Sequence, residues 1–323
     1  MPKNAKKEQR KAKDQLRFGI GEWYGRPFGK LTPEERKAYA DMQKLKKRDQ
    51  PPQPCPFRTS PSKNCSKTGG VCSIRLYRKS GEEGTVTIDG NEGSLRALCP
   101  QRFKQDNTIY NLISQKLLRS HAPVILGEVP FLQASTKQAG NDIKKEFKDV
   151  GSIDNVLVHP DDPTKWCAVE LQAVYFSGDS MNHEFALLRD YDLQVLPFPA
   201  AKRRPDYRSS GPKRLMPQLQ TKVPTISRWG KKMAVVVDKD FYEALGEMNE
   251  VQNEDVSGSE IIWFVVKYVD SGELYRVELE SVHLTTLDEA VKGLTGGHPV
   301  SMETFEIRIK ERVAAQLRKS LSD

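Results

Sequence analysis

The sequence predicts a mixed α/β fold, in which a mixed sheet is flanked by helices. From residue 106 onward, short runs rich in Val, Ile and Leu alternate with segments whose apolar residues recur at helical spacing. Two of the apolar runs, at 154–159 and 166–174, are joined by the turn Pro160-Asp-Asp-Pro163. Proline is rare inside strands and common in turns, so this pattern predicts a β-hairpin.

Length and composition favour a folded, basic protein. The chain has 323 residues, of which 37% are hydrophobic, enough for one large domain or two modest ones. The net charge of +8 indicates a polyanionic partner, although many basic proteins bind no nucleic acid. The sequence has neither an apolar run of transmembrane length nor an apolar signal region at its start, so we expect a cytoplasmic protein without a membrane partner.

Three segments follow one another along the chain. Residues 1–50 are rich in Lys and Arg and predict a basic helical arm, within which Thr32-Pro33-Glu34-Glu35 marks a helix start. Its first 15 residues are either a solvated tail or a DNA contact. After a proline-rich linker, residues 51–105 form a cysteine module, and residues 106–323 form the α/β domain.

The elements of the α/β domain are predicted in order from periodicity and turn signals. A strand precedes the hairpin, and three further strands follow it. The predicted strands outside the hairpin cover 123–132, 232–238, 260–269 and 274–283. The predicted helices cover 107–120, 181–191, 239–248 and 302–321, and a long irregular basic segment occupies 202–232.

The cysteine module carries four cysteines within a short stretch. They are Cys55, Cys65, Cys72 and Cys99. In a chain without a secretion signal, such a cluster binds a metal more often than it forms disulfides, and four thiolates suit tetrahedral zinc or iron. The alternative is four free buried cysteines. Cys167 lies apart in the second strand of the hairpin and is expected to be a small buried hydrophobe.

The hairpin carries the candidate chemistry. Glu170 and Gln172 lie two residues apart on one strand and therefore share a face, across the hairpin from Asp154. Two carboxylates in an apolar setting predict a site for a hard cation such as Mg²⁺. The alternative is a solvated face without function, and a register slip of one residue would move Asp154 to the other face.

Longer strings in both regions resemble one family. The pattern Asp154, spacer, Glu170-x-Gln172 resembles the Asp…Glu-x-Lys core of PD-(D/E)XK nucleases, with Gln172 at the lysine position. The string Cys-Ala-Val-Glu-Leu-Gln-Ala-Val-Tyr-Phe-Ser-Gly178, together with Cys-Pro-Phe, Lys-x-Gly-Gly-Val-Cys and Leu-Cys-Pro-x-Arg-Phe, resembles NotI-type restriction endonucleases. The resemblance implies a PD-(D/E)XK restriction-endonuclease-like core in residues 106–323.

The resemblance also implies an activity and its cofactors. It implies a bacterial, homodimeric type II restriction endonuclease that cuts double-stranded DNA at a GC-rich palindrome with Mg²⁺. Asp154 and Glu170 would bind Mg²⁺, whereas Gln172 cannot act as a general base and carries no charge. It implies structural iron in the four-cysteine site, with zinc as the alternative from the residues. Glu128, on the strand before the hairpin, is a fourth acidic candidate, and Glu146 is its rival.

DNA binding is assigned to the basic segment 202–232. Its candidate contacts are Arg203, Arg204, Arg208, Lys213 and Arg214. A solvated loop is the alternative for any single residue. Two other functions stay open: a catalytically inactive, metal-stabilised DNA-binding protein, in which Gln172 marks a decayed site, and a structure-specific repair or recombination nuclease.

Overall fold

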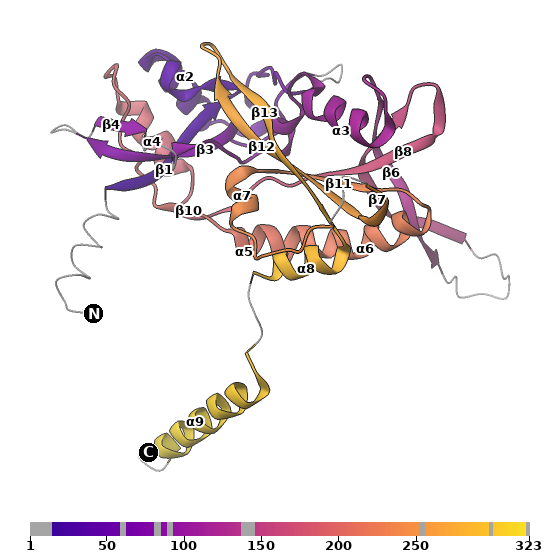
Figure 1. Cartoon of the computed structure of the whole chain (residues 1–323). Coiled ribbons are helices and arrows are strands. Elements are labelled where there is room, and N and C mark those ends of the chain that lie inside the picture. The colour runs from indigo at the N-terminus through magenta and orange to yellow at the C-terminus, as the bar shows by residue number, and fades with distance from the viewer. Residues whose placement is uncertain are drawn as a thin grey trace.

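A mixed sheet forms the centre of the molecule. The structure, a computed structural model, describes residues 15–58, 63–80, 85–88, 93–136, 146–251, 256–296 and 300–320. Within these ranges, six strands pair in the order β13-β12-β11-β8-β7-β6 (Figure 1). They are β6 (Val124–Thr136), β7 (Glu146–His159), β8 (Asp162–Leu171), β11 (Met233–Asp238), β12 (Ile261–Asp270) and β13 (Tyr275–Thr285).

The middle of this sheet is parallel, and both its edges are antiparallel. β11 pairs in parallel with β8 on one side and with β12 on the other. Every residue of β11 is buried, and its run Met-Ala-Val-Val-Val-Asp is typical of a parallel strand covered on both faces. β7 and β8 form the predicted antiparallel hairpin. The mixed α/β fold predicted from the sequence is therefore confirmed.

Helices cover both faces of the sheet. Helix α3 (Thr108–Leu118) packs on one face through Ile109 and Ile113. Helices α6 (Met216–Arg228) and α8 (Leu287–Thr295) lie side by side on the other face (Figure 1). Each face has its own apolar core, so the position of α6 is set by packing against the sheet.

A second sheet precedes the central one. It contains β1 (Leu16–Trp23), β2 (Arg26–Pro27), β3 (Val71–Ser80), β4 (Thr85–Ile88) and β5 (Arg96–Ala97). The prediction of a helical arm over residues 1–50 is wrong for β1 and β2. Tertiary packing overrides the basic composition there, because Ile20 and Trp23 are buried against β3 and its surroundings. Residues 1–14 lie outside the described ranges.

The predicted helix start at Thr32 is confirmed. Helix α2 (Pro33–Met42) follows a capping box, in which Glu35 N donates to Thr32 Oγ1 at 3.2 Å and Thr32 N donates to Glu35 at 2.9 Å. Short helical turns lie between the sheets and helices. They are η1 (Phe28–Lys30), η2 (Lys47–Asp49), η4 (Pro100–Asn107) and η6 (Val256–Gly258).

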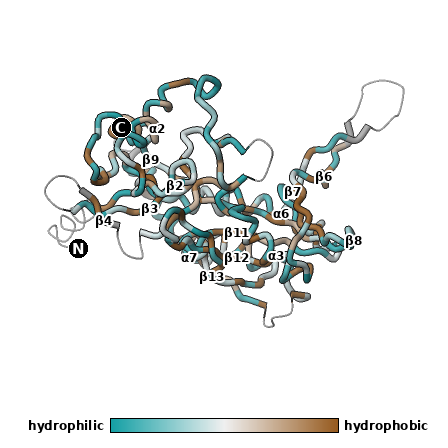
Figure 2. The backbone as a smooth tube through the Cα atoms, turned by 90° about the horizontal axis from the view of Figure 1, so that it is seen from above, coloured by the Kyte–Doolittle hydropathy of each residue, from teal (hydrophilic) through white to brown (hydrophobic). Residues whose placement is uncertain are grey.

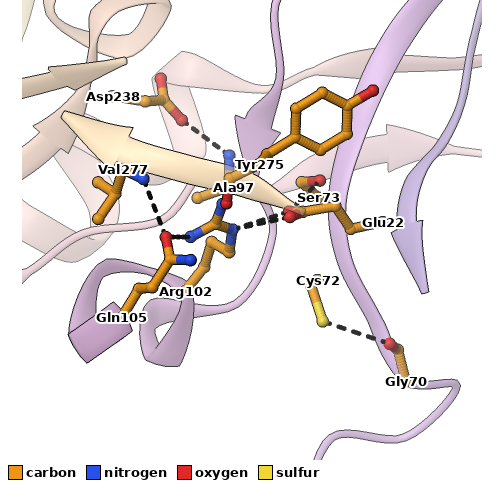
Figure 3. Close-up of polar contacts among 10 residues, drawn as sticks. All are labelled: Glu22, Gly70, Cys72, Ser73, Ala97, Arg102, Gln105, Asp238, Tyr275 and Val277. Atoms are coloured by element: carbon orange, nitrogen blue, oxygen red, sulfur yellow. Dashed lines mark hydrogen bonds and ion pairs between the residues drawn. The ribbon is translucent and has the colours of Figure 1, made fainter. Parts of the chain in front are cut away.

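A buried polar network joins the two sheets (Figure 3). Arg102 of η4 donates from Nε to Glu22 of β1 at 2.8 Å and from Nη2 to the carbonyl of Tyr275 in β13 at 2.7 Å. Gln105 accepts from Arg102 and from the backbone N–H of Val277. Because Glu22 and Arg102 are both fully buried, these bonds hold the N-terminal sheet against β13.

Most predicted elements are present with small shifts in their bounds. The segment predicted as a helix over 239–248 forms only α7 (Lys239–Glu243). Helix α4 (Asn182–Asp190) and helix α9 (Met302–Ser320) lie within their predicted ranges. Figure 2 shows the β6–β7 hairpin extending away from the rest of the molecule. No helix in the part of the chain that the structure describes is long and apolar enough to cross a membrane.

Most of the basic segment 202–232 forms regular secondary structure, whereas an irregular path was predicted. After β9 (Phe176–Gly178), strand β10 (Arg203–Pro205) pairs with it, and three helical pieces follow. These are α5 (Tyr207–Ser210), η5 (Gly211–Leu215) and α6. Its prolines indicated an irregular path, but Pro212 and Pro217 lie at the first turn of a helical piece, where no N–H partner is needed, and only Pro224 is internal.

Candidate active site

Two carboxylates and one ammonium group meet beside the β7–β8 hairpin. Asn155 of β7 pairs with Val169 of β8, and one step further along the same register Asp154 lies opposite Glu170. The predicted juxtaposition of Asp154 and Glu170 is therefore present. The ammonium group is that of Lys222, which comes from α6 on the face of the sheet.

Lys222 bridges the two acids. Its Nζ donates to Glu170 Oε2 at 2.8 Å and lies 3.4 Å from Asp154 Oδ1. A third bond, of 2.9 Å, runs to Oε1 of Gln218, one turn earlier on the same helix. The lysine side chain is only 8% exposed, so its charge is stabilised by these three oxygens and not by water.

The two carboxylates differ in their surroundings. The side chain of Glu170 is 4% exposed, whereas that of Asp154 is 50% exposed. The pKa of Glu170 is raised to about 7: burial is the largest cause, the charge of Lys222 opposes it, and the nearby Asp154 adds to it. The negative form of Glu170 is thus disfavoured by its surroundings, and Lys222 offsets only part of this effect.

Gln172 lines the same cleft as the two acids, as the strand alternation predicts. The cleft has a volume of about 710 Å³ and also contains Arg203 and Arg214. The side-chain amide of Gln172 donates to the carbonyl of Ala173 at 2.6 Å. Its N–H group is therefore directed at its own neighbour in the chain and contacts neither carboxylate.

Glu128 lies on the far side of Asp154. Both residues line a second cleft of about 360 Å³, to which Lys104 and Arg58 contribute positive charge. Glu128 is exposed and has a φ of 52°, a left-handed conformation that is uncommon for residues other than glycine. Such backbone conformations often occur at functional sites, so Glu128 remains a candidate site residue.

Of the five predicted DNA-binding residues, only two line the cleft that contains the acids. Arg203 and Arg214 line it directly, and the guanidinium group of Arg214 stacks on Tyr175 at 4.7 Å. Arg204 and Arg208 line an adjoining pocket of about 490 Å³. Lys213 is exposed on η5 and lines neither of these pockets.

Arg203 has buried hydrogen-bond donors without partners. Within the described residues, its Nε and Nη2 atoms are buried and make no hydrogen bond. Burial lowers the pKa of Arg203, and the nearby Glu184 and Asp179 oppose that effect. A guanidinium group placed in this way gains from an added anionic partner.

The four clustered cysteines come together in space, but their thiols do not form a metal site in the structure. Cys55, Cys65 and Cys72 pack around Phe57, and the backbone N–H of Cys99 donates to the carbonyl of Cys72 at 3.2 Å. Cys72 Sγ faces the carbonyl of Gly70 (Figure 3). Across the described ranges, no three His, Cys, Asp or Glu side chains are grouped as a metal ion requires.

Comparison with known families identifies the chain. A family model described as restriction endonuclease NotI matches residues 42–279, which is more than half of the protein. The chain belongs to the NotI restriction endonuclease family. No curated protein sequence matches it. The predicted family is confirmed, and membership makes this chain a site-specific deoxyribonuclease of the type II class, acting on DNA.

The carboxylate pair of this NotI-family enzyme fits a magnesium ion. Mg²⁺ takes oxygen ligands, retains several waters and commonly binds proteins through one or two carboxylates. Asp154 and Glu170 already share one cation, the ammonium group of Lys222, which shows that both carboxylates face the same point. These two residues would therefore hold the ion.

Lys222 contacts both carboxylates of the candidate site, and the sequence did not lead us to expect it there. It lies among Leu219, Val223 and Ile226, which form the fully buried stripe of α6. A lysine inside an apolar helical stripe is an unusual pattern, since lysine is almost never buried without a partner. That pattern could have revealed it, had the prolines not indicated an irregular segment.

Proposed function

We propose that the enzyme is a Mg²⁺-dependent type II restriction endonuclease with a PD-(D/E)XK-type site, which cuts double-stranded DNA at a GC-rich palindrome. The observation that carries this proposal is the convergence of Asp154 and Glu170 on one cation, at a cleft lined by Arg203 and Arg214. Acidic side chains hold the metal, and basic side chains hold the phosphates.

The roles of the residues follow from their positions. Asp154, exposed at the cleft, and Glu170, buried behind it, bind the ion from two adjacent strands. When bound, Mg²⁺ lowers the pKa of a coordinated water and stabilises charge on the phosphoryl oxygens. Gln172 lines the cleft and offers its carbonyl oxygen to orient water, while Glu128 borders the site from the strand before the hairpin.

DNA is held by the segment between β9 and α6. Arg203 and Arg214 contact the phosphates nearest the cut, since they share a cleft with the acids. Arg204 and Arg208, in the adjoining pocket, together with the exposed Lys213, contact the flanking DNA. Arginine also reads guanine edges bidentately, which suits a GC-rich target.

Two properties of the assembly complete the proposal. A palindromic site is matched by two-fold symmetry, so the enzyme acts as a homodimer. The sedimentation coefficient at micromolar concentration tests this: a single species with the mass of one chain, with and without DNA, is inconsistent with it. We also propose that structural iron, or zinc, would draw together the four cysteine thiols of the N-terminal module, which are not grouped as metal ligands in the described residues. Elemental analysis of the purified protein tests that assignment, and protein free of both metals overturns it.

The carboxylates provide the decisive test of activity. Asp154→Ala and Glu170→Ala should each reduce Mg²⁺-dependent cleavage of genomic DNA by at least about 10³-fold, because each removes a ligand of the ion. Glu278→Ala, which removes an exposed carboxylate of the edge strand β13, is the matched control and should cleave normally. Run-off sequencing of the fragments gives the target and the cut position.

The outcomes separate the alternative functions. A discrete fragment pattern with one palindromic cut site supports the proposal. DNA binding without cleavage in any divalent metal indicates a non-catalytic DNA-binding protein. Cutting of branched or nicked substrates, with no discrete fragments from genomic DNA, indicates a repair or recombination nuclease.

A further inference from the structure

The proposed site lacks a positive charge where related nuclease cores have a lysine. Gln172 occupies that position, carries no charge, and directs its amide N–H group at Ala173. Gln172 can therefore stabilise negative charge on a phosphoryl oxygen only through its amide dipole, and not through a positive charge. A cation from another element must supply this stabilisation, or the metal must supply all of it.

Lys222 reaches the site from α6, the helix that packs on the face of the central sheet. Its Cα belongs to α6, which packs through Leu219, Val223 and Ile226 against the sheet, yet its Nζ lies within 3.4 Å of both carboxylates. Its partner Gln218 lines the active-site cleft one turn away. The lysine is therefore held at the site by a rigid helix.

Stability alone does not account for this lysine. Burying an ion pair costs desolvation energy that the attraction often fails to recover, and replacing such a pair by apolar residues is often neutral or stabilising. The neighbouring buried residues of α6, Leu219, Val223 and Ile226, are all apolar. An aliphatic residue paired with an apolar partner would pack there at no electrostatic cost.

Nζ of Lys222 lies between the two carboxylates that would hold the ion. An ammonium group 2.8 Å from Glu170 and a divalent cation bound to the same carboxylate repel one another at close range. Lysine has a flexible stem of four methylene groups, and the cleft beside Gln218 gives its head group a second position. That second position is where the proposed function places the phosphate of the DNA.

We propose that Lys222 is the missing lysine of this active site: it holds Asp154 and Glu170 together in the metal-free protein and contacts the scissile phosphate in the loaded complex. The inference rests on the proposed function. In the hydrolysis, a water oxygen bonds to phosphorus, one ester P–O bond breaks, and a water proton is released to solvent while the leaving oxygen takes one up. Lys222 exchanges no proton, and its charge offsets that on the phosphoryl oxygen.

The test separates catalysis from binding and stability. Lys222→Met should lower the single-turnover cleavage rate by about 10²–10³-fold, as is typical for loss of one preorganised donor. The dissociation constant for target DNA in Ca²⁺ should rise by no more than about tenfold, because one phosphate contact among several is lost while α6 keeps its apolar packing. Lys116→Met, which removes an exposed cation on α3, controls for general charge loss and should change neither quantity.

Relocating the charge gives the sharper readout. In the double variant Gln172→Lys/Lys222→Met, the lysine returns to the strand, and the rate should recover at least about tenfold over Lys222→Met. If Lys222 only neutralised the acids, its removal would free them, so Lys222→Met would bind Mg²⁺ more tightly in calorimetry and cleave at the wild-type rate. That result, or absence of recovery in the double variant, overturns the inference.

Failure of the inference differs from failure of the proposed function. If the wild type shows no metal-dependent cleavage, or if Asp154→Ala and Glu170→Ala cleave normally, the proposed function itself is wrong. If those variants are inactive while Lys222→Met is fully active, only the role of Lys222 is wrong. Where Lys222→Met melts below the assay temperature, Lys222→Arg preserves the charge and should retain more activity than Lys222→Gln.

Discussion

At the scale of single residues, Asp238 is a buried acid outside the candidate active site whose pKa is raised. It lies at the end of β11 and is 1% exposed. One oxygen accepts from the backbone N–H of Ala97 at 2.9 Å (Figure 3). The other caps α7 by accepting from Phe241 N at 2.9 Å. The pKa of Asp238 is raised from 3.8 to about 7: burial is the largest cause and Asp240 adds to it, while the hydrogen bonds from Phe241 and Ala97 oppose it.

This shift predicts a pH dependence of stability. Between about pH 4 and pH 7 the folded protein retains a proton on Asp238 that the unfolded chain releases, so the free energy of unfolding falls as the pH rises. Each unit of pKa difference is worth about 1.4 kcal/mol. Asp238→Asn cannot titrate, and the advantage of the wild type over it in metal-free urea denaturation should shrink between pH 4 and pH 7. A constant difference would contradict the prediction.

The acids of the candidate site could be predicted from the sequence, but the lysine could not. Asp154 and Glu170 stand out because strand alternation is a local rule that places i and i+2 on one face, and the hairpin turn brings the two strands together. Lys222 lies 52 residues from Glu170, and only tertiary packing decides which carboxylate a helical lysine meets. The family resemblance led to position 172, where no charge is present.

At the scale of elements, the pairing of β9 with β10 positions Arg203. Gly178 pairs with Arg203 and has a φ of 110°, which favours glycine. A Cβ atom at Gly178 would lie 2.2 Å from the carbonyl oxygen of Lys202. Any side chain at this position must therefore displace the backbone that carries Arg203.

Gly178→Ala should weaken DNA binding about tenfold, equivalent to about 1.4 kcal/mol, by moving Arg203 in the cleft. The dissociation constant for target DNA in Ca²⁺ measures the effect. Gly272→Ala is the matched control, because Gly272 has a φ of 92° but open space around its Cβ position. Alanine at position 272 therefore strains the backbone but meets no neighbouring atom. Equal effects of the two substitutions on DNA binding would argue against the prediction.

Elements were predicted well where packing and local pattern agree. β11 and β12 are recognisable because continuous apolar runs have no favourable place outside a buried sheet. β1 and α6 were missed for opposite reasons. The strand lies beside a basic terminus whose composition masks its buried residues. Of the two prolines of α6, Pro217 lies in the first turn, where a helix tolerates it, and Pro224 lies inside the helix.

At the scale of the whole molecule, the pair formed by Glu22 and Arg102 joins the N-terminal sheet to the nuclease domain. Both side chains are at most 1% exposed. Arg102→Met should lower the free energy of unfolding by about 3–5 kcal/mol, because it leaves Glu22 buried without its partner. Urea denaturation measures this effect. Glu22→Met/Arg102→Met should lose less than the single variant, and a larger loss in the double variant would contradict the explanation.

The parallel pairing of β8 with β11 also has a consequence for the time course of folding. The β7–β8 hairpin forms from nearby residues, so Asp154 and Glu170 can meet early in synthesis. Parallel strands need a long crossover, and here the crossover contains α6. A ribosome must therefore release more than 50 further residues before Lys222 can reach Glu170. The nascent enzyme thus acquires the charge of Lys222 at this site only after α6 has been synthesised.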